Sequence, residues 1–290
     1  MNQVIRRLSV RFYTLKFCLM RAKYFLFILL FAILTTASKN KVQDYSKVLP
    51  GVIMVSENLY YDETEASNFW WLEYLYWTRK NNPELYATHL PDTNVWSIDS
   101  MLNEPFSKFY LRHPLYRQYP VVGVSWNQAT EFCKWRTERV REFLMAQGKI
   151  DKAPKHFNFR LPTHAEYLMM FNDIKALPNK IGEEGKKKYR GLNRYNMKVK
   201  GTGKLGVAGD LNDNADVTAP ILSYWSNNFG VYNIKGNVAE WLLDSNTYAG
   251  GAWQTPMTED VSVVKTSKKP SAVIGFRCVC EISNERDSAL

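Results

Sequence analysis

The sequence predicts an α+β domain with a large share of irregular chain. Two segments carry the N-terminal capping pattern of a helix, and three short segments have the β-branched and aromatic content of strands. Long stretches without apolar periodicity lie between them. The chain has 290 residues, of which 46% are hydrophobic and 14% aromatic, so it can bury a sizeable core and is not globally disordered.

A strand and a helix are predicted at the start of the domain. Residues 51–61 (GVIMVSENLYY) have the composition of a strand. Ser67 or Asn68 can then cap a helix. The apolar residues that fall at helical spacing after this cap are Phe69, Leu72 and Tyr76. Residues 81–120 have little periodicity, and we expect irregular chain that is held by its aromatic side chains.

Two helices with a capping box are predicted in the middle of the chain. Ser125 and Gln128 have the capping-box spacing, and the helix that they open continues to about residue 147. One apolar stripe runs along this helix and consists of Ala129, Phe132, Cys133, Val140, Phe143 and Leu144. Thr163 and Glu166 repeat the capping pattern at the start of a second helix.

Two short strands and two long loops complete the predicted domain. The strands are VVGVSW at 121–126 and the alternating segment IGFRCVCEI at 274–282. Residues 179–194 mix glycine with many charges, which is typical of a solvated loop; a docking patch for an acidic partner is the alternative. Residues 201–220 have the composition of a loop. Because no internal repeat or long linker divides the chain, one domain is expected.

The N-terminal segment has the pattern of an export signal. Tyr24–Leu34 is apolar throughout, follows two basic residues and precedes small residues that end at Ala37. These eleven apolar residues cover only about half of the roughly 30 Å hydrocarbon core. We therefore expect a cleaved signal peptide at 1–37 and a domain at 38–290, with an uncleaved anchor as the alternative. Met20 is a second possible start.

The charge and the cysteines agree with export. The net charge is +10, but six basic residues and no acidic ones precede position 38, which leaves +4 for the rest of the chain. No nucleic-acid motif accompanies that charge, so nucleic acid is not an expected partner. Cys133, Cys278 and Cys280 remain after cleavage, which allows at most one internal disulfide. No cysteine closely follows the cleavage point, so no lipid anchor is predicted, and we expect a periplasmic or outer-membrane-associated protein.

Five segments stand out by their order and spacing. They are VVGVSWNQATEFCKW (121–135), RLPTHAEY (160–167), FGVYNIKGNVAEW (229–241), YAGGAW (248–253) and IGFRCV (274–279). Together they resemble the sulfatase-modifying-factor domain. The resemblance covers roughly 48–282 and implies the formylglycine-generating enzyme fold, which is related to C-type lectins and poor in regular secondary structure. Further segments, such as DETEASNFWWLEYLYW and LPDTNVW, resemble the gliding-motility and type IX secretion lipoprotein-like branch of Bacteroidetes.

The resemblance implies one disulfide. In the generating enzymes a cysteine on the helix after the VSW strand pairs with the cysteine of the terminal GFRC strand, and the matching residues here are Cys133 and Cys278. The bridge would close most of the domain into one loop, which the chain-entropy account values at roughly 4 to 5 kcal/mol. Two buried free thiols are the alternative. Cys280 lies two residues along the same strand, on the same face as Cys278, and is left unpaired.

The same resemblance implies that this chain lacks the copper chemistry of the family. Formylglycine generation needs two thiolates for Cu(I), which the enzymes supply as C-x4-C after a GGS-aromatic turn. Here GGAWQTPMTED puts Thr255 and Asp260 at the cysteine positions and Ala252 at the serine position. We therefore expect no copper and no catalytic residues. The chain also has no CxxC motif and only four isolated histidines, so neither a zinc site nor a histidine-rich iron site is predicted.

Calcium is the cofactor that the resemblance still implies. Calcium takes about six to eight oxygen ligands, both carboxylates and backbone carbonyls. One family site maps onto Asn233, Gly236, Val238 and Glu240, and a second maps onto Asn196, Met197, Asp213 and Ala215. The alternative is a metal-free turn in which Asn233 caps its own backbone and Glu240 pairs with a nearby arginine.

Two groups of side chains near the start of the domain bear on function. Asp62, Glu63 and Glu65 could be paired acids, but adjacent carboxylates on a turn are usually solvated, and we expect that here. The aromatic group after them exceeds what one helix face can bury, and consists of Trp70, Trp71, Tyr74, Tyr76 and Trp77. Part of this group must therefore cover the irregular segment or contact a partner.

These features favour a non-catalytic function. We expect an exported scaffold or interaction protein whose partners are envelope proteins of a gliding-motility or type IX secretion assembly. One alternative is an enzyme of the same superfamily with altered chemistry in the cleft around Trp241, Trp253, Thr255 and Asp260. Another is a lectin-like module that binds carbohydrate or peptide.

Overall fold

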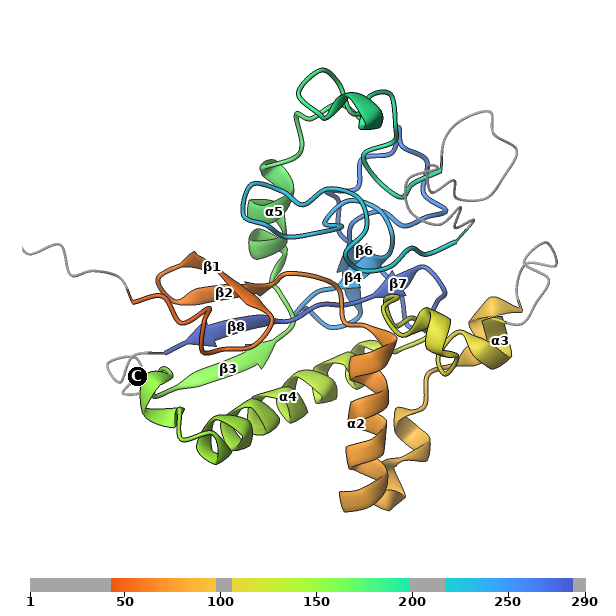
Figure 1. The fold of residues 1–290 in the computed structure, drawn as a ribbon. Helices are drawn as coiled ribbons and strands as arrows, with labels where there is room; N and C mark the ends of the chain where they lie inside the picture. Colours follow the sequence, from red (N-terminus) through yellow and green to blue (C-terminus); the bar gives the residue numbers. More distant parts are fainter. Residues whose placement is uncertain (1–42, 98–105, 199–216, 284–290) are drawn as a thin grey trace, which may run out of the picture. The chain divides into compact units, whose positions relative to one another are not determined.

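The computed structural model describes residues 43–97, 106–198 and 217–283 (Figure 1). All of these residues except Gln43 belong to one compact unit, Asp44–Leu290. Their α-helices are α2 (Asn68–Asn81), α3 (Phe106–Phe109), α4 (Trp126–Ala146) and α5 (His164–Asn172). Within these three ranges, no helix has the length and apolar character needed to cross a membrane. The predicted signal peptide at 1–37 lies outside the described residues.

The described strands form two four-stranded sheets. The first has the order β1-β2-β8-β3, and its strands are β1 (Val52–Ser56), β2 (Leu59–Asp62), β8 (Val279–Ile282) and β3 (Phe157–Arg160). The second has the order β6-β5-β4-β7, and its strands are β6 (Lys265–Thr266), β5 (Thr247–Ala249), β4 (Ala239–Trp241) and β7 (Ile274–Gly275). All neighbours are antiparallel except β4 and β7. The short strands and long connections confirm the predicted α+β class with much irregular chain.

Both predicted capping boxes are confirmed. At α4, the Ser125 hydroxyl accepts from the backbone N–H of Gln128 at 3.3 Å, and Gln128 Oε1 accepts from the Ser125 N–H at 2.8 Å. Thr163 and Glu166 make the same reciprocal pair at α5. These side chains satisfy donors that a helix leaves without an internal partner, which fixes where each helix begins.

The predicted strands are corrected in three places. Residues 51–61 form a hairpin of β1 and β2 rather than one strand, and residues 274–282 contain both β7 and β8. The buried segment 121–126 is not a ladder strand at all. Gly123 has φ of 76°, its N–H donates to the Ser271 carbonyl at 3.1 Å, and its own carbonyl accepts from the Asp92 N–H at 2.7 Å. The segment therefore bonds to separate loops rather than to one neighbouring strand.

The two faces of the first sheet pack against different helices. Tyr60, Cys278 and Cys280 belong to the core that includes side chains of α2 and α4, whereas Tyr61 and Val279 belong to the core that includes side chains of α5. Side chains alternate between the faces of a strand, so Cys278 and Cys280 share a face, as predicted. A further aromatic cluster, which includes Trp96, Tyr110, Tyr116 and Tyr119, anchors the described parts of 81–120.

The predicted apolar face of α2 is wrong. Tyr76 is 72% exposed and Phe69 is 39% exposed, while the buried side chains include Trp71, Tyr74 and Leu75. Aromatic residues occupy so many positions of α2 that helical spacing alone selects no single face. The rotation of the helix is fixed at its start, because the Asn68 amide donates to the carbonyls of residues 110 and 116 at 3.0 Å each. Phe143, which the predicted stripe of α4 included, is 50% exposed.

Candidate functional site

A buried network of charged and amide side chains connects the end of β2 with β4, α4 and the chain before β8. Its members are less than a tenth exposed and are Asp62, Glu65, Arg136, Asn196, Asn233, Asn237, Glu240 and Arg277. A buried charge is costly unless it is paired and hydrogen-bonded. Each charge in the network must therefore find its partner inside the protein.

Two arginines neutralise two of the carboxylates. Arg136 Nη1 on α4 donates to Asp62 Oδ2 at 2.6 Å, and the same oxygen accepts from the Cys278 N–H at 2.8 Å. Arg277 Nε donates to both oxygens of Glu240 at 2.9 and 2.8 Å, and its Nη2 donates to Oε1 at 2.6 Å. These pairs connect α4 to β2, and β4 to the chain before β8.

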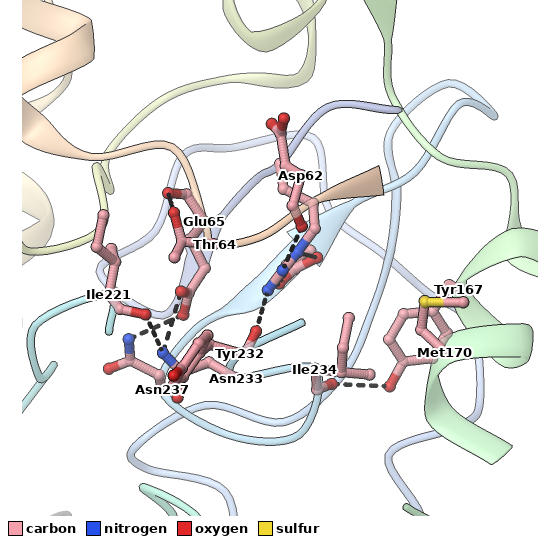
Figure 2. A network of polar contacts seen from close by, with 12 residues as sticks. Asp62, Thr64, Glu65, Tyr167, Met170, Ile221, Tyr232, Asn233, Ile234 and Asn237 are labelled. Carbon is pink, nitrogen blue, oxygen red and sulfur yellow. Dashed lines mark hydrogen bonds and ion pairs between the residues drawn. The ribbon is translucent and has the colours of Figure 1, made fainter. Parts of the chain in front are cut away.

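Glu65 is the third carboxyl group and has no arginine hydrogen-bonded to it among the described residues. Its Oε1 accepts from Asn237 Nδ2 at 2.8 Å and its Oε2 accepts from Asn233 Nδ2 at 3.1 Å (Figure 2). Burial raises the pKa of Glu65 to about 7; the charge of Arg277 lowers this pKa, and that of Glu240 raises it. With Glu65 protonated, the network holds two guanidinium groups and two carboxylates, so its charges balance.

The free energy of unfolding should fall as the pH rises from about 5 to 8. The folded pKa of Glu65 lies above its ordinary value of 4.5, so the folded state binds the extra proton in this range and loses that advantage as the pH passes about 7. The expected loss is about 3 kcal/mol for a shift of this size. Denaturant titrations of the wild type and of Glu65→Gln at each pH measure it, because the variant stays neutral throughout.

The exposed Glu57 provides the matched control for this experiment, and Glu57→Gln should leave the pH slope of the wild type unchanged. The contribution of Glu65 is the difference between the wild type and Glu65→Gln, which removes any titration that the two proteins share, such as that of His89. An unchanged slope in Glu65→Gln would contradict the assignment.

The expectation that Asp62, Glu63 and Glu65 are solvated is confirmed for Glu63 and wrong for the other two. Asp62 and Glu65 are both 0% exposed. Asp62 is the last residue of β2 and lies on the face of the sheet that α4 covers. Side chains alternate between the two faces of a strand, and this alternation was the sequence signal that could have predicted the burial of Asp62. No local signal marked Glu65, because its amide partners come from residues 233 and 237.

The first implied calcium set forms a turn but does not present a free carboxylate. Asn233 and Gly236 have φ of 54° and 93°. Both oxygens of Glu240 are bonded to Arg277, which is the arginine pairing stated as the alternative to calcium. A cation at this carboxylate would compete with a buried guanidinium group. Asn233 Nδ2 donates to Glu65 and to the Ile221 carbonyl.

The second implied set includes one better candidate ligand. Asn196 Oδ1 is buried and has no hydrogen-bond partner, so it fits the role of a cation ligand. Asn196 and Met197 also lie against Gly236, because a Cβ on that glycine would stand 2.7 Å from the Asn196 carbonyl oxygen. Asp213 and Ala215 lie outside the described residues. Within the described ranges, no group of three His, Cys, Asp or Glu side chains is arranged to hold a metal ion. Calcium stays a prediction.

The positions that match the copper ligands of the family do not fit a soft metal ion. Thr255 Oγ1 accepts from the Ala252 N–H at 3.0 Å, and Asp260 Oδ1 accepts from the Ser262 hydroxyl at 2.6 Å. Their oxygen atoms are hard donors, whereas Cu(I) prefers sulfur. Hydrogen bonds from Ser262 lower the pKa of Asp260. Trp253 beside this loop is fully buried, and its indole N–H donates to the Ala272 carbonyl at 3.3 Å.

Of the three cysteines in the described part of the chain, Cys133 lies on α4, Cys278 lies just before β8 and Cys280 lies in β8. Cys133 Sγ and Cys278 Sγ are 3.2 Å apart and are free thiols in this structure. Their proximity is what the predicted bridge requires, and the bridge itself stays a prediction. Burial raises the pKa of Cys133 well above its ordinary value and that of Cys280 to about 12, so neither thiol ionises readily.

Comparison with known proteins identifies a family for this chain. Residues 111–282 match the family described as the sulfatase-modifying factor enzyme 1-like domain. The formylglycine-generating enzyme of Mus musculus is 31% identical over 131 residues, which are 43% of this chain and 27% of that enzyme. The enzyme of Bos taurus is 26% identical over 211 residues, which are 70% of this chain and 41% of that enzyme. The solved structure of CarF has a TM-score of 0.44 and 20% identity, and covers 78% of this chain and 87% of CarF.

The family match spans more than half of the chain. The alignments with the two curated enzymes cover less than half the length of each enzyme. The family match includes α4 with its capping box, β3 and the chain up to β8, and therefore most of the buried charge network. The chain belongs to the sulfatase-modifying factor enzyme 1-like domain family and has its formylglycine-generating enzyme-like fold.

Proposed function

We propose that this chain is a non-catalytic, exported scaffold or interaction protein built on the sulfatase-modifying factor fold. Its partners are envelope proteins of a gliding-motility or type IX secretion assembly, and its location is periplasmic or at the outer membrane. The assembly and the location follow from the resemblance of the N-terminal half to that branch and from the predicted signal peptide at 1–37.

One observation carries the non-catalytic part of the proposal. Thr255 and Asp260 stand where the generating enzymes have their copper-binding thiolates, and both side chains are held in local hydrogen bonds. Neither can replace a thiolate as a ligand for Cu(I).

Exposed apolar side chains support a role in protein contacts. Tyr76 on α2 is 72% exposed, and Phe109 and Leu115 in the neighbouring irregular segment are 46% and 66% exposed. The two segments are joined through Asn68, whose amide bonds to backbone carbonyls of the irregular segment. Exposed aromatic side chains of this kind are enriched in protein interfaces.

Copper binding tests the non-catalytic part. The purified protein should bind no stoichiometric Cu(I) in competition with a chelator and should not oxidise a cysteine-containing peptide. The double variant Thr255→Cys/Asp260→Cys restores the C-x4-C spacing and should gain Cu(I) binding, which shows that the assay detects a site in this loop. Stoichiometric copper binding together with peptide oxidation by the wild type would overturn the proposal.

Site-specific photo-crosslinking in cells tests the partners. A photoreactive amino acid at position 76 should capture envelope proteins of the proposed assembly, identified by mass spectrometry. The same amino acid at position 269, which is exposed on another loop, is the control and should not capture them. Capture at neither position, or equally at both, would contradict a specific contact through α2.

A further inference from the structure

Residues 179–194 form a hairpin that extends beyond α5 (Figure 1). We call it the basic hairpin. Lys180 and Asn193 pair across its base as an antiparallel bridge, and the Ile181 N–H donates to the Leu192 carbonyl at 2.9 Å. The Ile181 side chain is 3% exposed, because the loop closes over it. The hairpin therefore has a defined backbone, which places its side chains.

The basic hairpin carries the net positive charge of the domain. It has six basic and two acidic residues, which gives a net charge of +4. Residues 38–290 together also carry +4, so the positive and negative charges of the rest of the domain balance. A charge of one sign that is concentrated on one projecting element favours a partner of the opposite charge.

Most of these positive charges have no carboxylate beside them. Arg194 pairs with Glu184, and this pair uses one charge of each sign. Arg190 donates to the backbone carbonyl of Glu183 at 3.2 Å, which leaves its charge uncompensated. Across the described ranges, no carboxylate lies within ion-pair distance of the four exposed lysines of the hairpin, which are Lys180, Lys186, Lys187 and Lys188.

The arrangement of the lysines fits a lipid surface better than an acidic protein. Lys187 and Lys188 lie in a single 3₁₀ turn that ends at Tyr189, and Lys186 directly precedes this turn. Successive residues of such a turn are about 120° apart, and all three lysines are exposed. A folded acidic protein would need carboxylates on several sides of the turn. Lipid headgroups are mobile in the plane of the membrane and can gather around each ammonium group.

Two aromatic rings lie beside these lysines. The rings of Tyr189 and Trp225 meet edge to face with 5.9 Å between their centroids, and Lys188 Nζ lies 4.6 Å from the Tyr189 centroid. Both aromatic side chains are partly exposed. Tyrosine and tryptophan favour the level of lipid headgroups, because their rings are apolar and carry one polar group.

We propose that the basic hairpin binds the surface of an anionic membrane. Its lysines contact lipid phosphates, and the rings of Tyr189 and Trp225 lie at the level of the headgroups. None of these residues belongs to α2, so this contact is separate from the protein contact proposed for that helix.

Co-sedimentation with lipid vesicles tests the proposal. The protein used starts at residue 38, which keeps the compact unit Asp44–Leu290 whole and removes the apolar segment at 24–34. It should bind phosphatidylcholine vesicles that contain phosphatidylglycerol, less so at high salt, and should not bind pure phosphatidylcholine. Equal binding to both kinds of vesicle, or binding to neither, would show that the proposal is wrong. Binding of soluble polyglutamate without binding of vesicles would assign the hairpin to an acidic protein instead.

Two matched double variants locate the contact. Lys187→Glu/Lys188→Glu should weaken binding to the anionic vesicles at least about twentyfold, since each lysine near such a surface contributes about fivefold in affinity. Lys268→Glu/Lys269→Glu changes the net charge equally at an exposed pair on another loop and should weaken binding by less than about threefold. If the two variants weaken binding equally, the overall charge holds the lipid and the hairpin does not.

A fluorescent label gives a readout that does not depend on charge reversal. A polarity-sensitive dye on Lys186→Cys should shift to shorter wavelengths when anionic vesicles are added, whereas the same dye on Lys269→Cys should not. The cysteines of the described chain are buried and should not react with the dye. An equal shift at both positions, or a shift only at position 269, would place the membrane contact elsewhere.

Discussion

Replacing Arg277 by methionine is expected to lower the free energy of unfolding by about 3 to 5 kcal/mol. The guanidinium is 0% exposed and makes three hydrogen bonds to Glu240 and one each to the Tyr232 and Asp62 carbonyls. Methionine nearly matches its length but leaves the Glu240 carboxylate buried without its cation. Breaking a buried pair from one side costs far more than the pair contributes, because the remaining charge has no solvent.

A double-mutant cycle separates this loss from simple damage to the core. Glu240→Gln removes the stranded charge, so the double variant Glu240→Gln/Arg277→Met should be more stable than Arg277→Met alone in urea titrations. Arg160→Met serves as the matched control, since Arg160 pairs with Glu166 where both side chains are partly exposed, and its loss should be smaller. If the double variant is less stable than Arg277→Met, the stranded charge is not the cause.

The local signals in the sequence predicted the helix starts well. Ser125 with Gln128 and Thr163 with Glu166 are bonded as their spacing indicated. A capping box works within four residues, so nothing distant in the chain is needed to read it. The family resemblance likewise rested on contiguous segments, and the match over residues 111–282 confirms the family.

The buried charge network could not be predicted in this way. Asp62 finds its arginine on α4, 74 positions along the chain, and Glu240 finds Arg277 37 positions along the chain. A run of acids on a turn is normally solvated. Alternation along β2 was a signal for Asp62, but only the tertiary fold shows that Glu65 points inward. The same holds for 121–126, whose backbone bonds go to separate loops. Pairings between distant residues leave no periodic pattern in the sequence.

Amino-acid composition does not determine which aromatic side chains are exposed. The excess of aromatic residues on α2 correctly indicated that part of the group stays outside the core, but not which members. The side chains of Trp70 and Trp135 come from different helices, so the cavity of about 310 Å³ that both line shows only once α2 and α4 are placed together.

The second large effect is expected from oxidation of Cys133 and Cys278. Their sulfur atoms already lie 3.2 Å apart, so a bridge needs little rearrangement. In the chain-entropy account a loop of this length is worth roughly 4 to 5 kcal/mol, although measured values range from about 2 to 5. Protein that is refolded under oxidising conditions should therefore be more resistant to guanidinium than the reduced protein by that amount. Free-thiol counting should find one remaining thiol in its mature chain.

Burial should make the bridge slow to exchange in the folded state. Thiol–disulfide exchange proceeds through the thiolate, and burial raises the pKa of Cys133 so far that little thiolate forms. Reduced, folded protein should thus oxidise slowly, whereas unfolded protein oxidises quickly and retains the bridge on refolding. Cys280→Ala is the control and should keep the stabilisation, while Cys133→Ala/Cys278→Ala should lose it. A peptide map that joins Cys280 to either partner would contradict the pairing, because Cys280 shares a strand face with Cys278 and is the one competing thiol within the described residues.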